Sequence, residues 1–174
     1  MALIPEENSQ TSLGQTKTAP INWYKTSLEI IDLPLIIISS SVEETKALGK
    51  NIAGMLDKGS IVAISGQLGA GKTCLTKGIA EGIGVKEEIT SATYTIISEY
   101  EAILPFYHID AYRLKGNDDF SAIGGEEIIY GEGISVIEWS DRIAAFIPIS
   151  AIKIDIDIIE EGKRRISLYM EGKK

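Results

Sequence analysis

The sequence has very little of the chemistry that builds disulfides or zinc sites. Its 174 residues include one cysteine, Cys74, and one histidine, His108. A single cysteine cannot form a disulfide within the chain, and the two residues together cannot supply the Cys and His ligands of a structural zinc site. We therefore expect a reducing compartment and predict a cytoplasmic protein.

Long apolar runs and an excess of basic charge are also missing. The most apolar stretch, around Leu35 to Ile38, falls far short of the roughly 18 residues that span a bilayer. The N-terminus lacks the basic-then-apolar pattern of a secretion signal. Lys and Arg number 17 against 25 Asp and Glu, a net charge of −8, and an acidic surface repels phosphate backbones. These features exclude a membrane protein and disfavour a stand-alone nucleic-acid clamp.

The chain does have enough apolar material for one packed domain. Hydrophobic residues make up 44% of the sequence and charged residues 24%, which is typical of a globular protein. Residues 1–33 are rich in Gln, Ser, Thr, Asn and Lys and hold no sustained period, so we interpret them as a flexible leader. Within it, Trp23 and Tyr24 are the part able to dock on the domain. Residues 34–174 are predicted to form that domain.

Strand and helix patterns follow one another after Pro34. A capping box at Ser41 and Glu44 predicts a helix that extends to about Asp57. The apolar run 61–64 is typical of a strand covered on both faces of a mostly parallel sheet. Other apolar segments lie at 35–38, 95–100, 106–110 and 134–138, and residues 152–158 and 166–170 alternate as a C-terminal antiparallel hairpin. This order predicts a three-layer α/β fold with a mixed sheet.

A glycine-rich octapeptide, GQLGAGKT, occupies residues 66–73 and matches Gly-x-x-x-x-Gly-Lys-Thr in full. It lies between the strand at 61–64 and a predicted helix that ends at Ile83 before Gly84. In that setting, backbone N–H groups and a helix N-terminus surround polyphosphate oxygens. We expect Lys72 and Thr73 at an exposed loop–helix junction, where Lys72 contacts the β- and γ-phosphates and Thr73 binds Mg²⁺. The predicted nucleotide-binding residues of this segment are Gly66, Gln67, Leu68, Gly69, Ala70, Gly71, Lys72, Thr73 and Cys74, with Cys74 packing beneath the loop.

Nucleotide hydrolysis also needs an acidic group for the metal and a group that orients water. Asp110 and Glu138 each follow an apolar segment, and ligands collect at the carboxyl ends of strands in open α/β sheets. Spacing alone is equally compatible with two solvated carboxylates. His108 would share a strand face with Asp110, and we favour a structural role for this histidine over a catalytic one.

Four motifs in order resemble one bacterial family. The segments GQLGAGKT, SATYTIISEY, YHIDAYRL and IEWSDRI look like those of the TsaE (YjeE) family, over about residues 61–148. Members are the ATPase subunit of tRNA N6-threonylcarbamoyladenosine (t6A37) biosynthesis. The resemblance implies a P-loop NTPase fold, ATP and Mg²⁺ as cofactors, and TsaD and TsaB as partners. It also implies that TsaD transfers the carbamoyl group and that tRNA is contacted mainly through the partners.

The resemblance carries over to individual residues as well. It implies that Thr73 and Glu138 hold Mg²⁺, and that Asp110 aligns or activates the attacking water. Together with Lys72, Asp110 forms the predicted catalytic pair.

The resemblance also bears on residues of these motifs outside the phosphate loop and the site carboxylates. Thr93 and Tyr94 match its switch-like segment, in which Ala92 replaces the usual proline. Trp139 is a candidate for packing against the nucleotide or a partner, with core filling as the other interpretation.

The residues alone also allow other functions for a protein with a phosphate-binding loop. A small-molecule kinase usually needs an arginine-rich lid, and this chain has only Arg113, Arg142, Arg164 and Arg165. A nucleotide-sensing binding module would not need two site carboxylates, and a GTPase is disfavoured because Asn-Lys-x-Asp is absent. Of the arginines, only Arg113 is expected near a site element, so we predict weak ATPase activity without partners.

Overall fold

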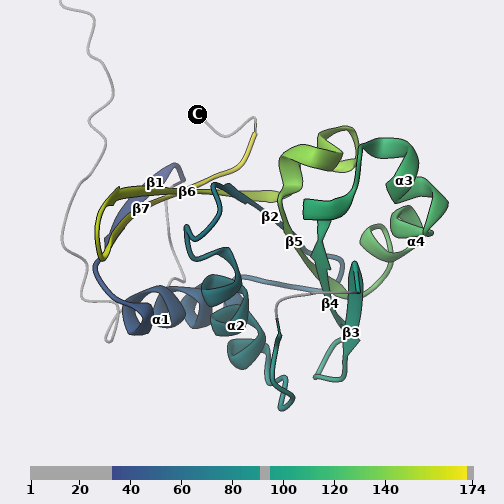
Figure 1. The fold of residues 1–174 in the computed structure, drawn as a ribbon. Coiled ribbons are helices and arrows are strands. Elements are labelled where there is room, and N and C mark those ends of the chain that lie inside the picture. The colour runs from purple at the N-terminus through teal and green to yellow at the C-terminus, as the bar shows by residue number, and fades with distance from the viewer. Residues whose placement is uncertain (1–32, 91–94, 172–174) are drawn as a thin grey trace, which may run out of the picture.

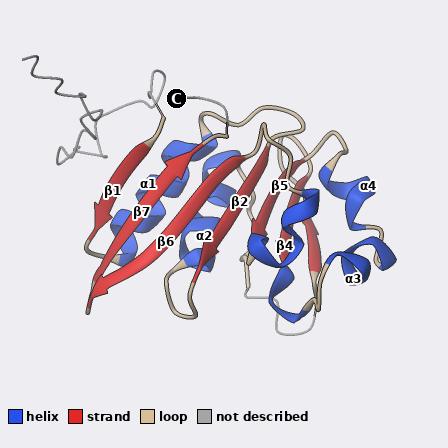
Figure 2. Ribbon diagram, turned by 90° about the horizontal axis from the view of Figure 1, so that it is seen from above, coloured by secondary structure: helices blue, strands red, loops and turns tan. Residues whose placement is uncertain are grey.

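A seven-stranded sheet organises the chain (Figures 1 and 2). The computed structural model describes residues 33–90 and 95–171. The strands are β1 (Leu35–Ser39), β2 (Ile61–Gly66), β3 (Ile97–Tyr100), β4 (Phe106–Asp110), β5 (Ile134–Glu138), β6 (Ile152–Glu160) and β7 (Lys163–Tyr169). Their order across the sheet is β1-β7-β6-β2-β5-β4-β3. Of the predicted leader 1–33, only Leu33 is among the described residues, so the expectation for Trp23 and Tyr24 lies outside them.

Parallel and antiparallel pairs divide the sheet by position. The central strand β2 runs parallel to both β5 and β6, and β4 runs parallel to β5. The pairs β1–β7, β6–β7 and β3–β4 are antiparallel. The predicted mixed sheet and C-terminal hairpin are therefore confirmed. Because β2, β4 and β5 are parallel, their carboxyl ends meet at one edge of the sheet, where the polar motifs lie.

Two long helices, α1 (Val42–Ala53) and α2 (Lys72–Ile83), cover one face of the sheet (Figure 2). Ser41 caps α1 as predicted, because its Oγ accepts a hydrogen bond from the Glu44 N–H at 3.1 Å. The predicted extension of α1 to Asp57 is wrong, since the chain leaves the helix at Gly54. The Gly54 N–H bonds to the Asn51 carbonyl three residues back at 3.2 Å, which tightens the last turn and ends the helix.

Glycines let α1 and α2 approach until their backbones touch. A Cβ at Gly49 would lie 2.5 Å from the Leu75 carbonyl oxygen, and one at Gly78 would lie 2.3 Å from that of Lys46. Any larger side chain at either position would have to push the helices apart. The two glycines therefore set the spacing of the helix layer and, through α2, the height of the phosphate loop above the sheet.

Shorter helices pack against part of the opposite face. These are η1 (Ala111–Arg113), α3 (Asn117–Ala122), α4 (Gly125–Ile129) and η2 (Ser140–Phe146). They bury a second apolar cluster that includes Ile109, Phe120 and Ile137. Over β1, β7 and β6 this face carries no helix from the described ranges (Figure 2), so the third layer covers only part of the sheet. No helix within residues 33–90 or 95–171 has the length and apolar character needed to cross a membrane.

Candidate nucleotide-binding site

The glycine-rich loop joins the end of β2 to the start of α2. Gly66 has φ 138°, and a Cβ there would lie 2.4 Å from the Ile156 carbonyl oxygen, so both the backbone angle and the space require glycine. Gly71, with φ 106°, precedes α2 and supplies no side-chain cap. The first N–H groups of α2 therefore keep their capacity to bind an anion.

A cavity of about 420 Å³ opens in front of this helix end. It lies at the edge where β2, β4 and β5 end, as expected for a parallel α/β sheet. Predicted site residues share its lining with Arg113, which the sequence placed near a site element, and with Tyr112, which it did not single out. The lining residues are Leu68, Gly69, Gly71, Lys72, Thr73, Cys74, Asp110, Tyr112, Arg113, Glu138 and Trp139. Gly66, Gln67 and Ala70 belong to the loop without lining the cavity, and the predicted switch residues Ala92, Thr93 and Tyr94 lie outside the described residues.

Lys72 is folded back onto its own loop. Its Nζ donates hydrogen bonds to the carbonyl oxygens of Gly66 at 2.6 Å and Gln67 at 2.9 Å. It also lies 3.6 Å from the centre of the Trp139 ring. Lys72 is only 4% exposed, so the expectation of an exposed junction is wrong for this residue: the carbonyls and the indole draw the ammonium inward. Burial lowers the pKa of Lys72, and the nearby carboxylates of Glu138 and others oppose that shift.

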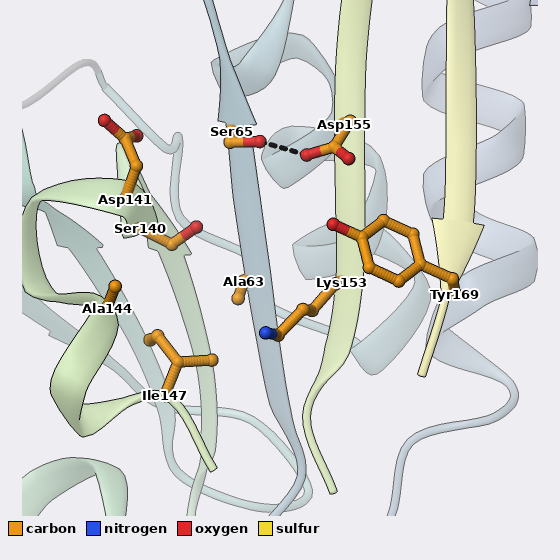
Figure 3. A pocket seen from close by; sticks show the side chains of 9 residues that line it. All are labelled: Ala63, Ser65, Ser140, Asp141, Ala144, Ile147, Lys153, Asp155 and Tyr169. Atoms are coloured by element: carbon orange, nitrogen blue, oxygen red, sulfur yellow. Dashed lines mark hydrogen bonds between the residues drawn. The ribbon is translucent and has the colours of Figure 1, made fainter. Parts of the chain in front are cut away.

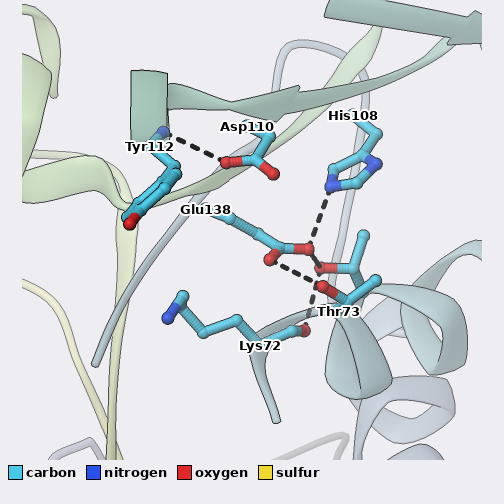
Figure 4. Close-up of polar contacts among 7 residues, drawn as sticks. Lys72, Thr73, His108, Asp110, Tyr112 and Glu138 are labelled. Carbon is cyan, nitrogen blue, oxygen red and sulfur yellow. Dashed lines mark hydrogen bonds and ion pairs between the residues drawn. The ribbon is translucent and has the colours of Figure 1, made fainter. Parts of the chain in front are cut away.

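Glu138 receives hydrogen bonds on both carboxylate oxygens (Figure 4). Oε2 accepts from the Thr73 hydroxyl at 2.9 Å, so the two predicted Mg²⁺ ligands are in direct contact. Oε1 accepts from the Thr76 hydroxyl and from His108 Nε2, each at 2.9 Å. Thr76 was missed in the sequence, although its spacing of three residues from Thr73 places both on one face of α2. Glu138 is 2% exposed, and a buried carboxylate requires such partners.

His108 lies behind Glu138 and does not line the cavity. Because a carboxylate oxygen only accepts, the imidazole donates from Nε2. Its Nδ1 is buried and has no partner among the described residues. This placement agrees with the structural role that we favoured, and the hydrogen bond orients the Glu138 carboxylate.

Asp110 lies beside Glu138, because β4 and β5 pair these two residues in register. Its Oδ1 accepts a hydrogen bond from the Tyr112 N–H at 3.1 Å and so caps η1 (Figure 4). Asp110 therefore combines a capping role with a position on the cavity wall.

The oxygen donors at this edge fit a magnesium ion that arrives with a nucleotide. Thr73 and Glu138 present a hydroxyl and a carboxylate, which are hard ligands. No group of three or more His, Cys, Asp and Glu side chains converges on a metal position in the described part of the chain. Mg²⁺ commonly binds through one or two protein oxygens together with phosphates and water. The donor set suits that arrangement and does not form a complete protein cage.

An aromatic wall closes one side of the cavity. Trp139 has φ 58°, the left-handed conformation, and its ring lies 4.8 Å from that of Tyr112. Arg142 approaches the other ring, 5.8 Å from the centre of Tyr112. Trp139 thus lines the cavity with one side while it packs against the second apolar cluster with the other. The contact with the apolar cluster agrees with core filling, and packing against a nucleotide or partner stays a prediction.

Cys74 packs beside the loop, where its thiol approaches the Val42 carbonyl oxygen at 3.4 Å. Burial raises the pKa of this thiol, and the nearby cations of Lys46, Lys77 and Arg164 oppose the shift. Arg164 therefore lies near the loop, although the sequence had suggested that only Arg113 would approach the site.

A second, smaller cavity of about 150 Å³ lies on the face of the sheet opposite α1 and α2 (Figure 3). Ser65, the residue before Gly66, donates a hydrogen bond there to Asp155. Burial and a hydrogen bond to Asp155 raise the pKa of Tyr169 to about 12. The lining contains no residue of the glycine-rich loop and no end of α2, whereas the larger cavity is lined by both.

A buried parallel strand, a GxxxxGKT loop and a helix at the carboxyl edge of the sheet define the P-loop NTPase fold. A family model described as threonylcarbamoyl adenosine biosynthesis protein TsaE matches residues 39–166. The chain belongs to the TsaE family, as its motifs suggested.

Curated relatives and a solved structure agree with this assignment. The chain is 41% identical over 131 residues to the tRNA threonylcarbamoyladenosine biosynthesis protein TsaE of Treponema pallidum, covering 75% of this chain and 97% of the relative. It is 38% identical over 133 residues to the protein of that name from Bacillus subtilis, covering 76% and 83%. The crystal structure of Bacillus subtilis YdiB superposes with a TM-score of 0.66 at 35% identity, covering 83% of this chain and 90% of that one.

Proposed function

We propose that this protein is a Mg²⁺-dependent ATPase required for t6A37 formation in tRNA, acting with TsaB and TsaD rather than transferring the carbamoyl group itself. The observation that carries the proposal is the Thr73–Glu138 hydrogen bond beside the uncapped start of α2. It places a hydroxyl and a carboxylate next to a phosphate-binding helix end, as ATP with a bound metal requires. The pathway assignment is supported by the names of the relatives.

Each residue of the site has a distinct part in this proposal. The α2 N-terminus and Lys72 bind the phosphates, which requires Lys72 to exchange the Gly66 and Gln67 carbonyls for phosphate oxygens. Thr73 and Glu138 hold the metal, which neutralises charge on the phosphates when bound. Asp110 orients the attacking water from the neighbouring strand. Thr93, Tyr94 and Trp139 complete the nucleotide or partner contacts in this proposal.

Two points support a dependence on partners: the effect of a supplied arginine on turnover and the negative net charge of this chain. A supplied arginine is worth roughly 10³ to 10⁵ in turnover in related GTPases. We propose that isolated turnover is weak and that TsaB and TsaD stimulate it by docking near the switch segment. With a net charge of −8, the subunit is poorly suited to hold tRNA by itself, so tRNA contact is mainly indirect. The same proposal places the protein in the cytoplasm.

Lys72→Ala tests the proposal, with Lys77→Ala as the matched control. Both lysines lie on α2, but Lys77 pairs with Glu88 at 3.7 Å and does not line the cavity. We expect Lys72→Ala to stay folded and to lose most Mg²⁺-ATP affinity in calorimetry, whereas Lys77→Ala binds like the wild type. Near-normal affinity in folded Lys72→Ala would contradict the P-loop assignment.

Steady-state phosphate release, measured alone and with TsaB and TsaD at saturating Mg²⁺-ATP, tests the role of the partners. We expect slow release from the isolated protein and strong stimulation by the two partners. Fast release that partners do not change would contradict the partner role. Transfer of phosphate to a small metabolite would favour the kinase alternative.

A further inference from the structure

An arginine from the C-terminal hairpin contacts the outer side of the phosphate loop. Arg164 Nε donates to the Ala70 carbonyl oxygen at 3.3 Å, and Nη2 lies 3.5 Å from that of Gly69. Strand β7 places Arg164 between its partners Ser39 on β1 and Ile158 on β6. This position lies outside the 61–148 segment that carries the motifs of the loop, the metal ligands and the water-orienting residue.

The contact restrains the two carbonyl groups that Arg164 reaches, those of Gly69 and Ala70. A trans peptide points its carbonyl and the following N–H in opposite directions. When the Ala70 carbonyl is bound on the outside, the Gly71 N–H is therefore turned toward the inside of the loop. The preceding N–H, that of Ala70, is already used within the loop, bonded to Gln67 at 3.2 Å. At Gly69 and Gly71, no atom lies within 4 Å of where a Cβ would be, so side-chain packing does not restrain these residues.

We propose that Arg164 is a positioning residue that holds the outer carbonyls of the loop so that its inner N–H groups face the phosphates. The inference rests on the nucleotide binding proposed above. A guanidinium suits the task because its planar fork presents two donors to two successive carbonyls, whereas a lysine ammonium is a single point on a flexible stem. The energetic contribution appears in nucleotide binding, since a loop that is already shaped loses less conformational freedom when the phosphate arrives.

The next residue along β7 provides the matched control. Arg165 points to the other face of the sheet, where its Nη2 donates to Asp157 at 2.8 Å and its Nε at 3.3 Å. Arg164→Gln and Arg165→Gln therefore make the same change of charge at adjacent positions, but only the first removes a contact with the loop. Arg164→Lys keeps the charge and loses the fork.

The experiment measures the Kd of Mg²⁺-ADP by calorimetry, the KM and kcat for ATP with and without partners, and the nucleotide-free melting temperature. Because Arg164→Gln removes the guanidinium donors to both loop carbonyls and leaves the loop less preorganised, we expect a Kd and KM about tenfold higher. We expect an intermediate Kd in Arg164→Lys, a wild-type Kd in Arg165→Gln, and an unchanged kcat in all three, while the melting temperature shows separately any loss of fold stability.

Two results would overturn the inference. One is equal Kd values in Arg164→Gln and Arg165→Gln, with or without a change in melting temperature. The other is a fall in kcat at unchanged Kd, which would assign Arg164 to the transition state rather than to the shape of the loop. Lys72→Ala is measured alongside: if the wild type itself bound no nucleotide, the proposed function would fail. If the wild type binds and Lys72→Ala does not, any failure belongs to Arg164 alone.

Discussion

Replacing Thr76 by valine should show how much stability the protein draws from the hydrogen bonds around its buried carboxylate. Valine keeps the shape of the side chain and removes the hydroxyl that donates to Glu138 at 2.9 Å. Thr76 is fully buried, so water cannot replace the lost donor. Glu138 would keep its bonds to Thr73 and His108 and lose one of three. The loss is therefore expected to weaken the native state without removing the site.

The magnitude follows from the kind of acceptor. A hydrogen bond to a charged group contributes about 1.5–3 kcal/mol to stability, whereas one between neutral groups contributes about 0.5–1.5 kcal/mol. A loss of about 2 kcal/mol lowers the melting temperature of a chain of this size by roughly 6 °C. Thr76→Val should therefore be destabilised by about that amount.

Thr45→Val is the matched control, because Thr45 has the same geometry with a neutral partner. Thr45 is buried in α1, and its hydroxyl lies 3.1 Å from the Ser41 carbonyl oxygen four residues back, just as the Thr76 hydroxyl lies 3.1 Å from that of Lys72. Its side-chain partner is the Ser39 hydroxyl at 2.7 Å, in place of a carboxylate. Each of the two valine variants thus removes a single hydroxyl group from the interior of one helix.

The assay is urea unfolding and thermal melting of both variants and the wild type, with a chelator present and no nucleotide. We expect Thr76→Val to lose about 1 kcal/mol more than Thr45→Val. Equal losses would refute the reasoning, because the charge of Glu138 would then add nothing to the bond. A smaller loss in Thr76→Val than in Thr45→Val would show that the buried carboxylate is better satisfied without this donor.

Three further predictions concern helix packing, the site carboxylates and the second cavity. Gly78→Ala should lower the free energy of unfolding by about 1–3 kcal/mol in urea titrations, because a Cβ there would lie 2.3 Å from a backbone carbonyl oxygen of α1. An unchanged midpoint would show that the helices separate freely. Glu138→Gln should weaken Mg²⁺-dependent nucleotide binding, whereas Asp110→Asn should spare binding and reduce turnover; equal binding losses in calorimetry would mean that the roles are wrongly divided. Tyr169 has a pKa raised from 10.0 to about 12 by burial and Asp155, so its stabilising contribution is complete below pH 10 and lost as the pH rises through about 12. Tyr169→Phe should show a smaller fall in unfolding free energy over that range, and identical pH profiles would contradict this.

Local patterns in the sequence were sufficient for elements whose geometry depends on neighbouring residues. The loop from Gly66 to Thr73 adopts its turn because its glycines take backbone angles that few other residues reach, as seen at Gly66 and Gly71. The capping box at Ser41 starts α1, and the alternating segments near the C-terminus form the β6–β7 hairpin. The prediction of α1 was wrong at its far end because Gly54 ends the helix while the apolar pattern continues toward Asp57.

Only the tertiary structure decided which side chains meet around the loop. The pairing of β4 with β5 sets Asp110 beside Glu138, and the position of α2 over the sheet brings Thr76 within reach of the same carboxylate. Arg164 reaches Ala70 across 94 residues of chain, through a hairpin that enters the sheet next to β2. Even the burial of Lys72 depends on Trp139, which follows strand β5 and comes from a distant part of the chain. The physical reason is that backbone preferences act over a few residues, whereas strand order and register are fixed by burying the whole apolar core at once.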